Sequence, residues 1–126
     1  MPRVVHFDIQ ADDVSRAAAF YSKVFGWKIN KWEGPGPMEY WLITTGDDKE
    51  PGINGGLGKR PGPERPGGFI NAVDVPSVDE YVRRITQSGG TIVMPKMSIP
   101  TVGYFALCAD TEGNSFGIIQ LDKNAK

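Results

Sequence analysis

The sequence is poor in cysteine and has no excess of charge of either sign. Its 126 residues include one cysteine, Cys108, which excludes a disulfide within the chain and a zinc site built on paired cysteines. Fourteen Lys and Arg residues against 15 Asp and Glu give a formal net charge of −1, so the basic surface of a nucleic-acid-binding protein is missing. No apolar run approaches the roughly 20 residues of a membrane span, and the segment MPRVVHFDIQ is too polar for a secretory signal. We therefore expect a cytoplasmic protein that binds neither nucleic acid nor membrane.

The chain has enough apolar residues for a folded core. Hydrophobic residues make up 40% and aromatic residues 10% of the sequence, which excludes disorder of the whole chain. The 16 glycines and 10 prolines predict many tight turns, and therefore short strands rather than a helix bundle.

The first half of the sequence predicts one strand, one helix and three further strands. Residues 3–10 alternate between an apolar set (Val5, Phe7, Ile9) and a polar set (His6, Asp8, Gln10), as in a strand with two different faces. Apolar residues then recur at helical spacing between an N-cap at Asp12-Asp13 and a stop at Gly26. Further strands are expected at residues 27–32, 39–45 and 53–57.

The second half repeats this order. A strand is expected at residues 69–75, and Ser77 with Glu80 forms a capping box before a helix that ends at Gly89-Gly90. Strands are expected at residues 91–95, 102–109 and 115–121. A shift of 64 residues superimposes the two halves through the first helix, with Asp13 on Ser77 and Gly26 on Gly90.

These elements predict an α+β fold of two βαβββ modules, which form curved mixed sheets around a cleft and carry their helices on the outer faces. The single domain would comprise a first module at 1–57, a Gly/Pro linker at 58–68, a second module at 69–121 and a tail at 122–126. The apolar face of the first strand is expected to pack on the helix, which leaves His6 and Asp8 facing the cleft.

Four segments carry a resemblance to a known family. They are VVHFDI at 4–9, RAAAFYSKVFGW at 16–27, INGGL at 53–57, and the turn DTEGN before FGIIQ at 110–120. With these segments the chain resembles the vicinal oxygen chelate superfamily of glyoxalases, extradiol dioxygenases and bleomycin-resistance proteins. The sequence departs from the family at Thr111, where proline is usual. The resemblance implies the paired βαβββ fold and a homodimer.

The resemblance also implies where a metal would bind. Enzymes of the superfamily usually hold a divalent metal with His, Glu or Gln on the first and last strands of each half. His6 lies at the first of these positions, but its counterpart is Ile70, and the last strand of the second half has Gly117. In the first half only Asn54 offers a donor, within the segment at 53–56. We therefore expect no metal and no other cofactor, with a divalent metal as the alternative.

Two polar residues of the first strand are candidates for chemistry. His6, the sole histidine, is a candidate acid/base or hydrogen-bond donor in the cleft, and Asp8 on the same face can fix its tautomer. The alternatives are an ordinary half-buried histidine and a solvated carboxylate. Cys108 lies in an apolar run and is expected to be a buried, inert thiol.

Aromatic side chains are the other candidates for a ligand site. Trp27, Tyr40, Trp41 and Tyr104 can line a pocket for a flat or apolar ligand, or else pack in the core or between subunits. Tyr40 and Trp41 are adjacent in a strand, so at most one of them faces the cleft. The predicted ligand-binding set therefore comprises His6, Asp8, Trp27, Tyr40, Trp41, Asn54 and Tyr104.

The function expected first is metal-free binding of a small organic molecule in the cleft. The alternatives are an enzyme of the lyase, isomerase or dioxygenase type, either metal-free with His6 as acid/base or metal-dependent, and a protein whose cleft is filled by its own side chains.

Overall fold

The computed structural model describes residues 2–33, 39–60 and 68–126. The chain forms two compact units, which we describe separately. The first module is His6–Phe69; the second is Ile70–Lys126 together with the chain up to Val5. Most of the predicted turn at 33–37 and of the predicted linker at 58–68 lies outside the described residues. At the edges of that linker, Gly58 and Lys59 end one strand and Gly68 begins the next.

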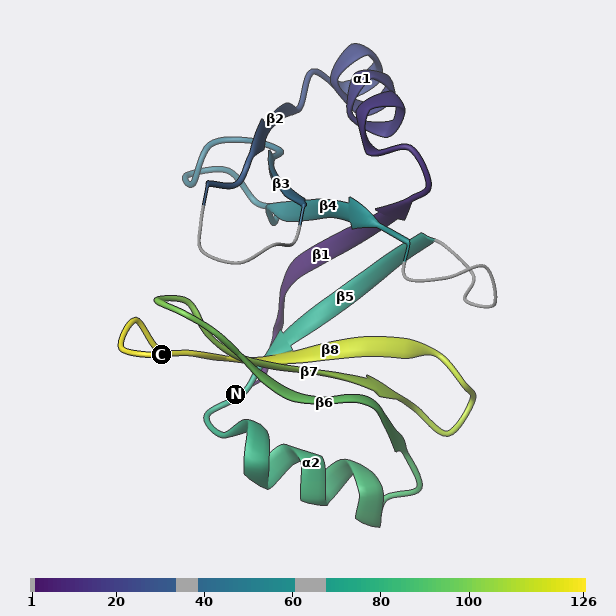
Figure 1. The fold of residues 1–126 in the computed structure, drawn as a ribbon, viewed down its shortest axis with the longest axis vertical. Coiled ribbons are helices and arrows are strands. Elements are labelled where there is room, and N and C mark those ends of the chain that lie inside the picture. Colours follow the sequence, from purple (N-terminus) through teal and green to yellow (C-terminus); the bar gives the residue numbers. More distant parts are fainter. Residues whose placement is uncertain (1, 34–38, 61–67) are drawn as a thin grey trace. The chain divides into compact units, whose positions relative to one another are not determined.

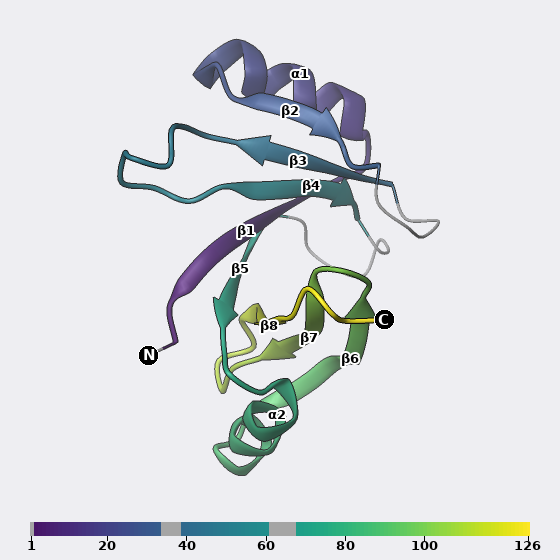
Figure 2. The same cartoon turned by 90° about the vertical axis from the view of Figure 1, so that its left-hand side faces the viewer.

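The first module contains one helix and a four-stranded mixed sheet (Figure 1). Its elements are β1 (Val4–Ala11), α1 (Val14–Phe25), β2 (Lys28–Lys31), β3 (Tyr40–Thr44) and β4 (Gly55–Lys59). The strand order is β2-β3-β4-β1, with β1 parallel to β4 and the other pairs antiparallel. Figure 2 shows α1 alongside this sheet. The predicted order of elements is confirmed.

The core of the first module lies between α1 and one face of the sheet. The buried residues of this core are Phe7, Ile9, Val14, Ile43 and Leu57. Phe7 and Ile9 therefore face α1, as the alternation in the sequence predicted, and His6 and Asp8 lie on the opposite face. Val5 does not join them: it is exposed and belongs to the second module, because β1 crosses from one module to the other at this point.

Both ends of α1 follow the sequence prediction. The Asp13 carboxylate accepts a hydrogen bond from the backbone N–H of Arg16 at 3.0 Å, which satisfies one of the free donors of the first turn. Gly26 ends the helix with φ +74°, a left-handed conformation that side chains of L-residues disfavour.

The second module repeats the arrangement. Its elements are β5 (Gly68–Asp74), α2 (Val78–Gln87), β6 (Thr91–Ile99), β7 (Gly103–Ala109) and β8 (Ser115–Leu121). The order is β5-β8-β7-β6, with β5 parallel to β8, the counterpart of the β1–β4 pair. Val75, Val78, Ala106, Cys108 and Ile118 form its core. Cys108 is fully buried, as predicted, and burial raises the pKa of its thiol.

Two predicted boundaries of the second module differ in the structure. Ser77 caps α2 by accepting from the backbone N–H of Glu80, but the helix ends at Gln87, and Gly89 rather than Gly90 adopts positive φ. Strand β6 continues past Pro95 to Ile99, four residues beyond the prediction. Proline is tolerated there because β6 is an edge strand with a register irregularity between Met94 and Met97.

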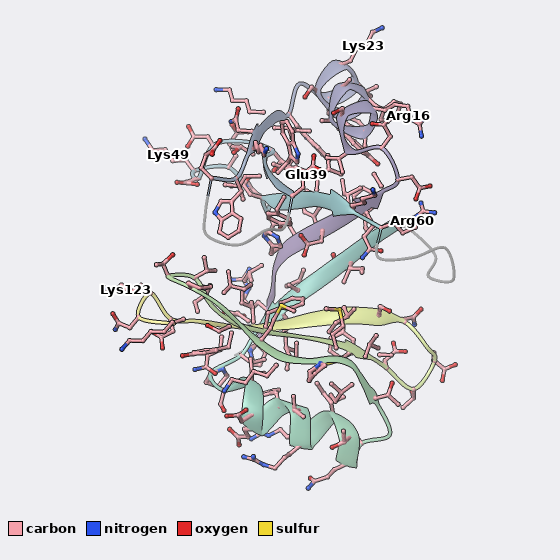
Figure 3. All side chains as sticks on the ribbon, viewed as in Figure 1. Arg16, Lys23, Glu39, Lys49, Arg60 and Lys123 are labelled. Carbon is pink, nitrogen blue, oxygen red and sulfur yellow. The ribbon has the colours of Figure 1, made fainter. Side chains whose placement is uncertain are left out.

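Charged side chains extend from the elements into solvent, for example Arg16 and Lys23 on α1 (Figure 3). In the part of the chain that the structure describes, neither helix has the length and apolar character needed to cross a membrane.

Candidate functional site

Three polar side chains meet on the face of the first module that is turned away from α1. His6 and Asp8 come from alternate positions of β1, and Tyr40 comes from the start of β3. The Tyr40 hydroxyl donates to Asp8 Oδ1 at 2.5 Å, and His6 Nε2 lies 3.2 Å from the same Oδ1 and 2.9 Å from Tyr40 Oη. We call these three residues the polar triad.

The register of β3 decides which of its two adjacent aromatic residues joins the triad. Tyr40 is that residue, whereas Trp41 packs against the core on the α1 side. The sequence left this choice open, because alternation shows only that the two rings point in opposite directions.

The Tyr40 ring lies over a glycine. Gly56 in β4 pairs with Asp8 in the parallel ladder, and a Cβ atom added at Gly56 would overlap the Tyr40 hydroxyl group. A side chain at position 56 and the Tyr40 ring therefore exclude each other. The glycine in this strand serves a close approach of a side chain, one of the readings its sequence allows.

Burial and charge keep the Tyr40 phenol protonated. The pKa of Tyr40 is raised well above its ordinary value, chiefly because the hydroxyl is buried and also because the Asp8 carboxylate lies beside it and accepts its hydrogen bond. The side chains of His6 and Asp8 are 31% and 25% exposed, so a ligand can reach the triad from solvent.

Trp32 is part of this site but was not among the predicted residues. Its ring lies edge-on to Tyr40 with 6.2 Å between centroids, and its backbone N–H donates to the Tyr40 carbonyl. Trp32 is five residues after Trp27, and an odd separation along an extended segment places the two rings on opposite faces. That spacing could have shown that only one of them accompanies His6.

The other predicted aromatic residues lie in hydrophobic packing. Trp27 stacks on Tyr21 and Phe25 at 5.5 and 5.1 Å between centroids, beside the core under α1. Tyr104 packs against the core under α2, and Lys96 Nζ lies 4.7 Å from the centre of its ring. The structure does not bring these rings, or Trp41, to the triad.

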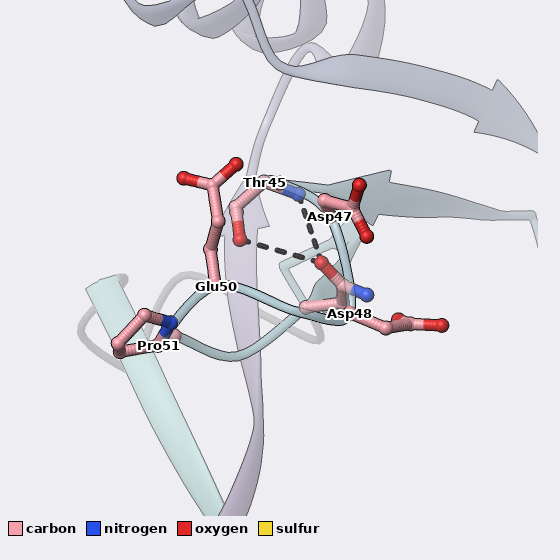
Figure 4. A pocket seen from close by; sticks show the side chains of 8 residues that line it. Thr45, Asp47, Asp48, Glu50 and Pro51 are labelled. Atoms are coloured by element: carbon pink, nitrogen blue, oxygen red, sulfur yellow. Dashed lines mark hydrogen bonds between the residues drawn. The ribbon is translucent and has the colours of Figure 1, made fainter.

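Asn54 lies in a turn rather than at the triad. Its side-chain oxygen accepts from the Thr45 backbone N–H at 2.9 Å and lies 3.3 Å from the Thr45 hydroxyl oxygen (Figure 4). These bonds close a hollow in the β3–β4 connection, which is lined mainly by polar residues and includes Asp47, Asp48 and Glu50. The amide oxygen that the sequence offered as a weak metal donor is therefore used to hold the turn.

The second module has the same ring-over-glycine arrangement. Gly117 in β8 pairs with Ala72, the counterpart of Asp8 at the shift of 64, and an added Cβ would collide with the Phe105 ring. Phe105 was not singled out from the sequence. A shift of 65 places Tyr40 on Phe105, so continuing the comparison of the halves into the later strands could have found it.

The residues at the superfamily's metal positions do not fit a metal. The paired registers assign Gly56 and Gly117 to the last-strand positions of the two modules, and Ile70 stands opposite His6 in the repeat. Among residues 2–33, 39–60 and 68–126, no three His, Cys, Asp or Glu side chains come together as a metal cluster. A divalent transition metal normally needs three or four such ligands.

A paired βαβββ fold with a polar site on the sheet face away from the helix defines a glyoxalase-like protein. The sequence pattern of the Glyoxalase/Bleomycin resistance protein/Dioxygenase superfamily matches residues 3–118, and the chain belongs to this superfamily. Among curated proteins, it is 26% identical over 124 residues to proteins of Mycobacterium bovis and Mycobacterium tuberculosis that carry the name "Putative glyoxylase CFP32". The match covers 93% of this chain but 45% of theirs, so the chain spans about half the length of these relatives.

Solved structures show the same fold at low identity. Methylmalonyl-CoA epimerase from Mycobacterium tuberculosis matches with a TM-score of 0.69 and 14% identity, over 94% of this chain and 87% of the epimerase. A glyoxalase/bleomycin resistance protein/dioxygenase superfamily member from Vibrio splendidus 12B01 matches with a TM-score of 0.62 and 18% identity, over 95% and 99% of the two chains. The predicted family and α+β fold class are confirmed.

Proposed function

We propose that this chain is a metal-free member of the superfamily that binds a small organic molecule at the polar triad. The observation that carries the proposal is the arrangement of Tyr40 over Gly56 and of Phe105 over Gly117. In both modules an aromatic ring occupies the space that a metal-binding side chain on the last strand would need.

The surroundings of the triad suit an organic ligand. His6, Asp8 and Tyr40 offer a small number of fixed polar atoms, and Trp32 adds an aromatic surface beside them. Small-molecule sites typically combine such an apolar or aromatic wall with a few well-placed polar groups. The ligand-binding role of Trp27, Trp41, Asn54 and Tyr104 finds no support in their positions, so the proposal rests on the triad and Trp32.

Metal content tests the first part of the proposal. Protein purified without a polyhistidine tag should contain no stoichiometric divalent metal by elemental analysis, and a chelator should leave its melting temperature unchanged. A metal near one per chain, with a lower melting temperature after chelation, would contradict the proposal and return the protein to the metal-dependent enzymes.

Ligand binding tests the second part. Because His6 is the sole histidine, its imidazole signals in an NMR spectrum report on the triad without ambiguity. A library of small oxygenated compounds, with an acyl-CoA ester included because a solved neighbour is a methylmalonyl-CoA epimerase, should yield compounds that shift these signals. Tyr40→Phe should weaken that binding, and the matched Tyr104→Phe in the second module should not. A library that leaves the His6 signals and the melting temperature unchanged would favour a site filled by side chains.

A second candidate is a metal-free enzyme that uses His6 as acid/base. The contact between His6 and the Asp8 carboxylate favours it, because orienting an imidazole in this way is common in proton-transfer sites. Compounds found in the screen would be incubated with the protein in D₂O, and exchange of a carbon-bound proton would be followed by NMR. An enzyme would catalyse this exchange and lose it in His6→Gln, whereas a binding protein would show no exchange.

We also propose that the protein is cytoplasmic and a homodimer. The near-neutral charge and the single buried cysteine suit a reducing compartment.

A further inference from the structure

We propose that Asp8 and Tyr40 hold the neutral His6 imidazole with its proton on Nε2, which makes Nδ1 the acceptor offered to a ligand carrying a hydrogen-bond donor or an acidic C–H. This inference rests on the proposed function, because it concerns the same site. It makes Asp8 and Tyr40 positioning residues that act through His6.

The Asp8 carboxylate specifies the proton on Nε2. A carboxylate only accepts hydrogen bonds, and its Oδ1 lies 3.2 Å from His6 Nε2. With the proton on Nδ1 instead, a nitrogen lone pair would face a negatively charged oxygen. With the proton on Nε2 the contact is a hydrogen bond assisted by charge.

Tyr40 requires the same arrangement. Its hydroxyl proton is committed to Asp8 Oδ1, so the Oη lone pairs are what His6 Nε2 meets at 2.9 Å. Both neighbours of Nε2 are therefore acceptors, and the Nε2–H group is shared between them. Since the phenol resists ionisation, Tyr40 continues to donate to Asp8 across the neutral pH range.

The opposite ring nitrogen remains available. Among the described residues, His6 Nδ1 makes no hydrogen bond, and the His6 side chain is 31% exposed. A neutral Nδ1 is an acceptor, so it selects a ligand with an O–H, an N–H or an acidic C–H.

For a C–H next to a carbonyl group, the available step is proton transfer. The C–H bond breaks, its electron pair stays on the substrate as an enolate, and an N–H bond forms at Nδ1. The resulting imidazolium points its Nε2–H at Asp8, whose negative charge stabilises it. Return of the proton to carbon restores the neutral imidazole, so no other reactant is needed.

The experiment is a ¹⁵N and ¹H NMR measurement of the single imidazole at about pH 8, where an imidazole is neutral. In the wild-type protein we expect only the Nε2-protonated form, with a ring proton protected from exchange with water. In Asp8→Ala and in Tyr40→Phe we expect a measurable Nδ1-protonated fraction and ring-proton exchange on the order of tenfold faster, the effect of losing about one hydrogen bond. The controls Asp79→Ala and Tyr104→Phe, which make the same side-chain changes in the second module, should behave like wild type.

A wild-type imidazole protonated on Nδ1 would overturn the inference. So would an unchanged ratio and exchange rate in both triad variants, provided that their backbone amide spectra show an intact fold. The measurement needs neither ligand nor metal. A failure of the ligand screen would therefore count against the proposed function and leave the tautomer result standing, and the reverse also holds.

Discussion

Gly56 lies beneath the Tyr40 hydroxyl, and any side chain there would have to displace the ring. Gly58, two residues further along β4, lies under the same ring with more room: an added Cβ would be 3.7 Å from Tyr40 Cδ1, an ordinary contact. The two glycines therefore form a matched pair for testing how tightly the triad is packed.

Gly56→Ala should destabilise the protein by about 1–3 kcal/mol, the usual cost of overpacking, and should also shift the imidazole signals of His6. Gly58→Ala should change both much less. Urea denaturation and an NMR spectrum of each variant measure the two effects. Equal effects of the two substitutions would show that the Tyr40 ring is not held over Gly56.

The raised pKa of Tyr40 predicts a loss of stability in alkali. The unfolded chain gives up the phenol proton at its ordinary pKa of about 10, before the folded protein does, so the stabilisation is complete below about pH 10 and falls as the pH rises beyond it. The free energy of unfolding should therefore fall more steeply above about pH 10 in the wild type than in Tyr40→Phe, by up to about 1.4 kcal/mol per pH unit. Urea denaturation between about pH 8 and 11 measures both slopes. Tyr104→Phe should keep the wild-type slope, and a Tyr40→Phe slope equal to that of wild type would contradict the assignment.

At the scale of single residues, the sequence predicted some of the site and missed the rest for one reason. Alternation along the first strand was sufficient to place His6 and Asp8 together, since both belong to one strand. The contribution of Tyr40 depends on how β3 is aligned with β4, and the packing under Phe105 depends on the alignment of β7 with β8. Those alignments are set by contacts between distant segments, which a local pattern does not contain.

The helices were the elements best predicted from sequence, because their boundaries depend on local chemistry. Asp13 and Ser77 each bond the backbone N–H three residues later. The later end of α2 was misplaced because two glycines stand in succession and only the conformation shows that Gly89 is the one with positive φ.

Gly26 offers a test of the end of α1. Nothing lies within 4 Å of a Cβ added there, so the cost of Gly26→Ala arises from its φ of +74° alone and should be about 1 kcal/mol. Gly46→Ala, which also enters open space but without a positive φ, should stay within about 0.5 kcal/mol of wild type. Thermal or urea unfolding compares the two, and a neutral Gly26→Ala would show that the helix ends differently.

At the scale of the whole molecule, the repeat at a shift of 64 is reproduced in strand order, helix capping and the glycine beneath an aromatic ring. Chemical similarity between the halves is lower than structural similarity. One module has a polar triad, while the corresponding positions of the other hold Ile70, Ala72 and Phe105.

The proposed homodimer is tested at this scale. Three apolar side chains of α1, Phe20, Val24 and Phe25, are each more than half exposed, and association commonly buries such surfaces. Sedimentation equilibrium should give a mass near twice 13.8 kDa at micromolar concentration. A mass of 13.8 kDa at all concentrations would contradict a dimer, and Phe20→Ser with Val24→Ser should weaken a dimer formed through this surface.

Strand β1 begins among the residues of the second module, where the Arg3 backbone exchanges hydrogen bonds with Asp74, and ends among those of the first. The ancestral unit of the repeat is thus no longer contained in a continuous half of the polypeptide. A protein cleaved between residues 69 and 70 would yield two fragments that complete each other, because the first fragment carries the segment that pairs with the second. Neither fragment would be an autonomous half.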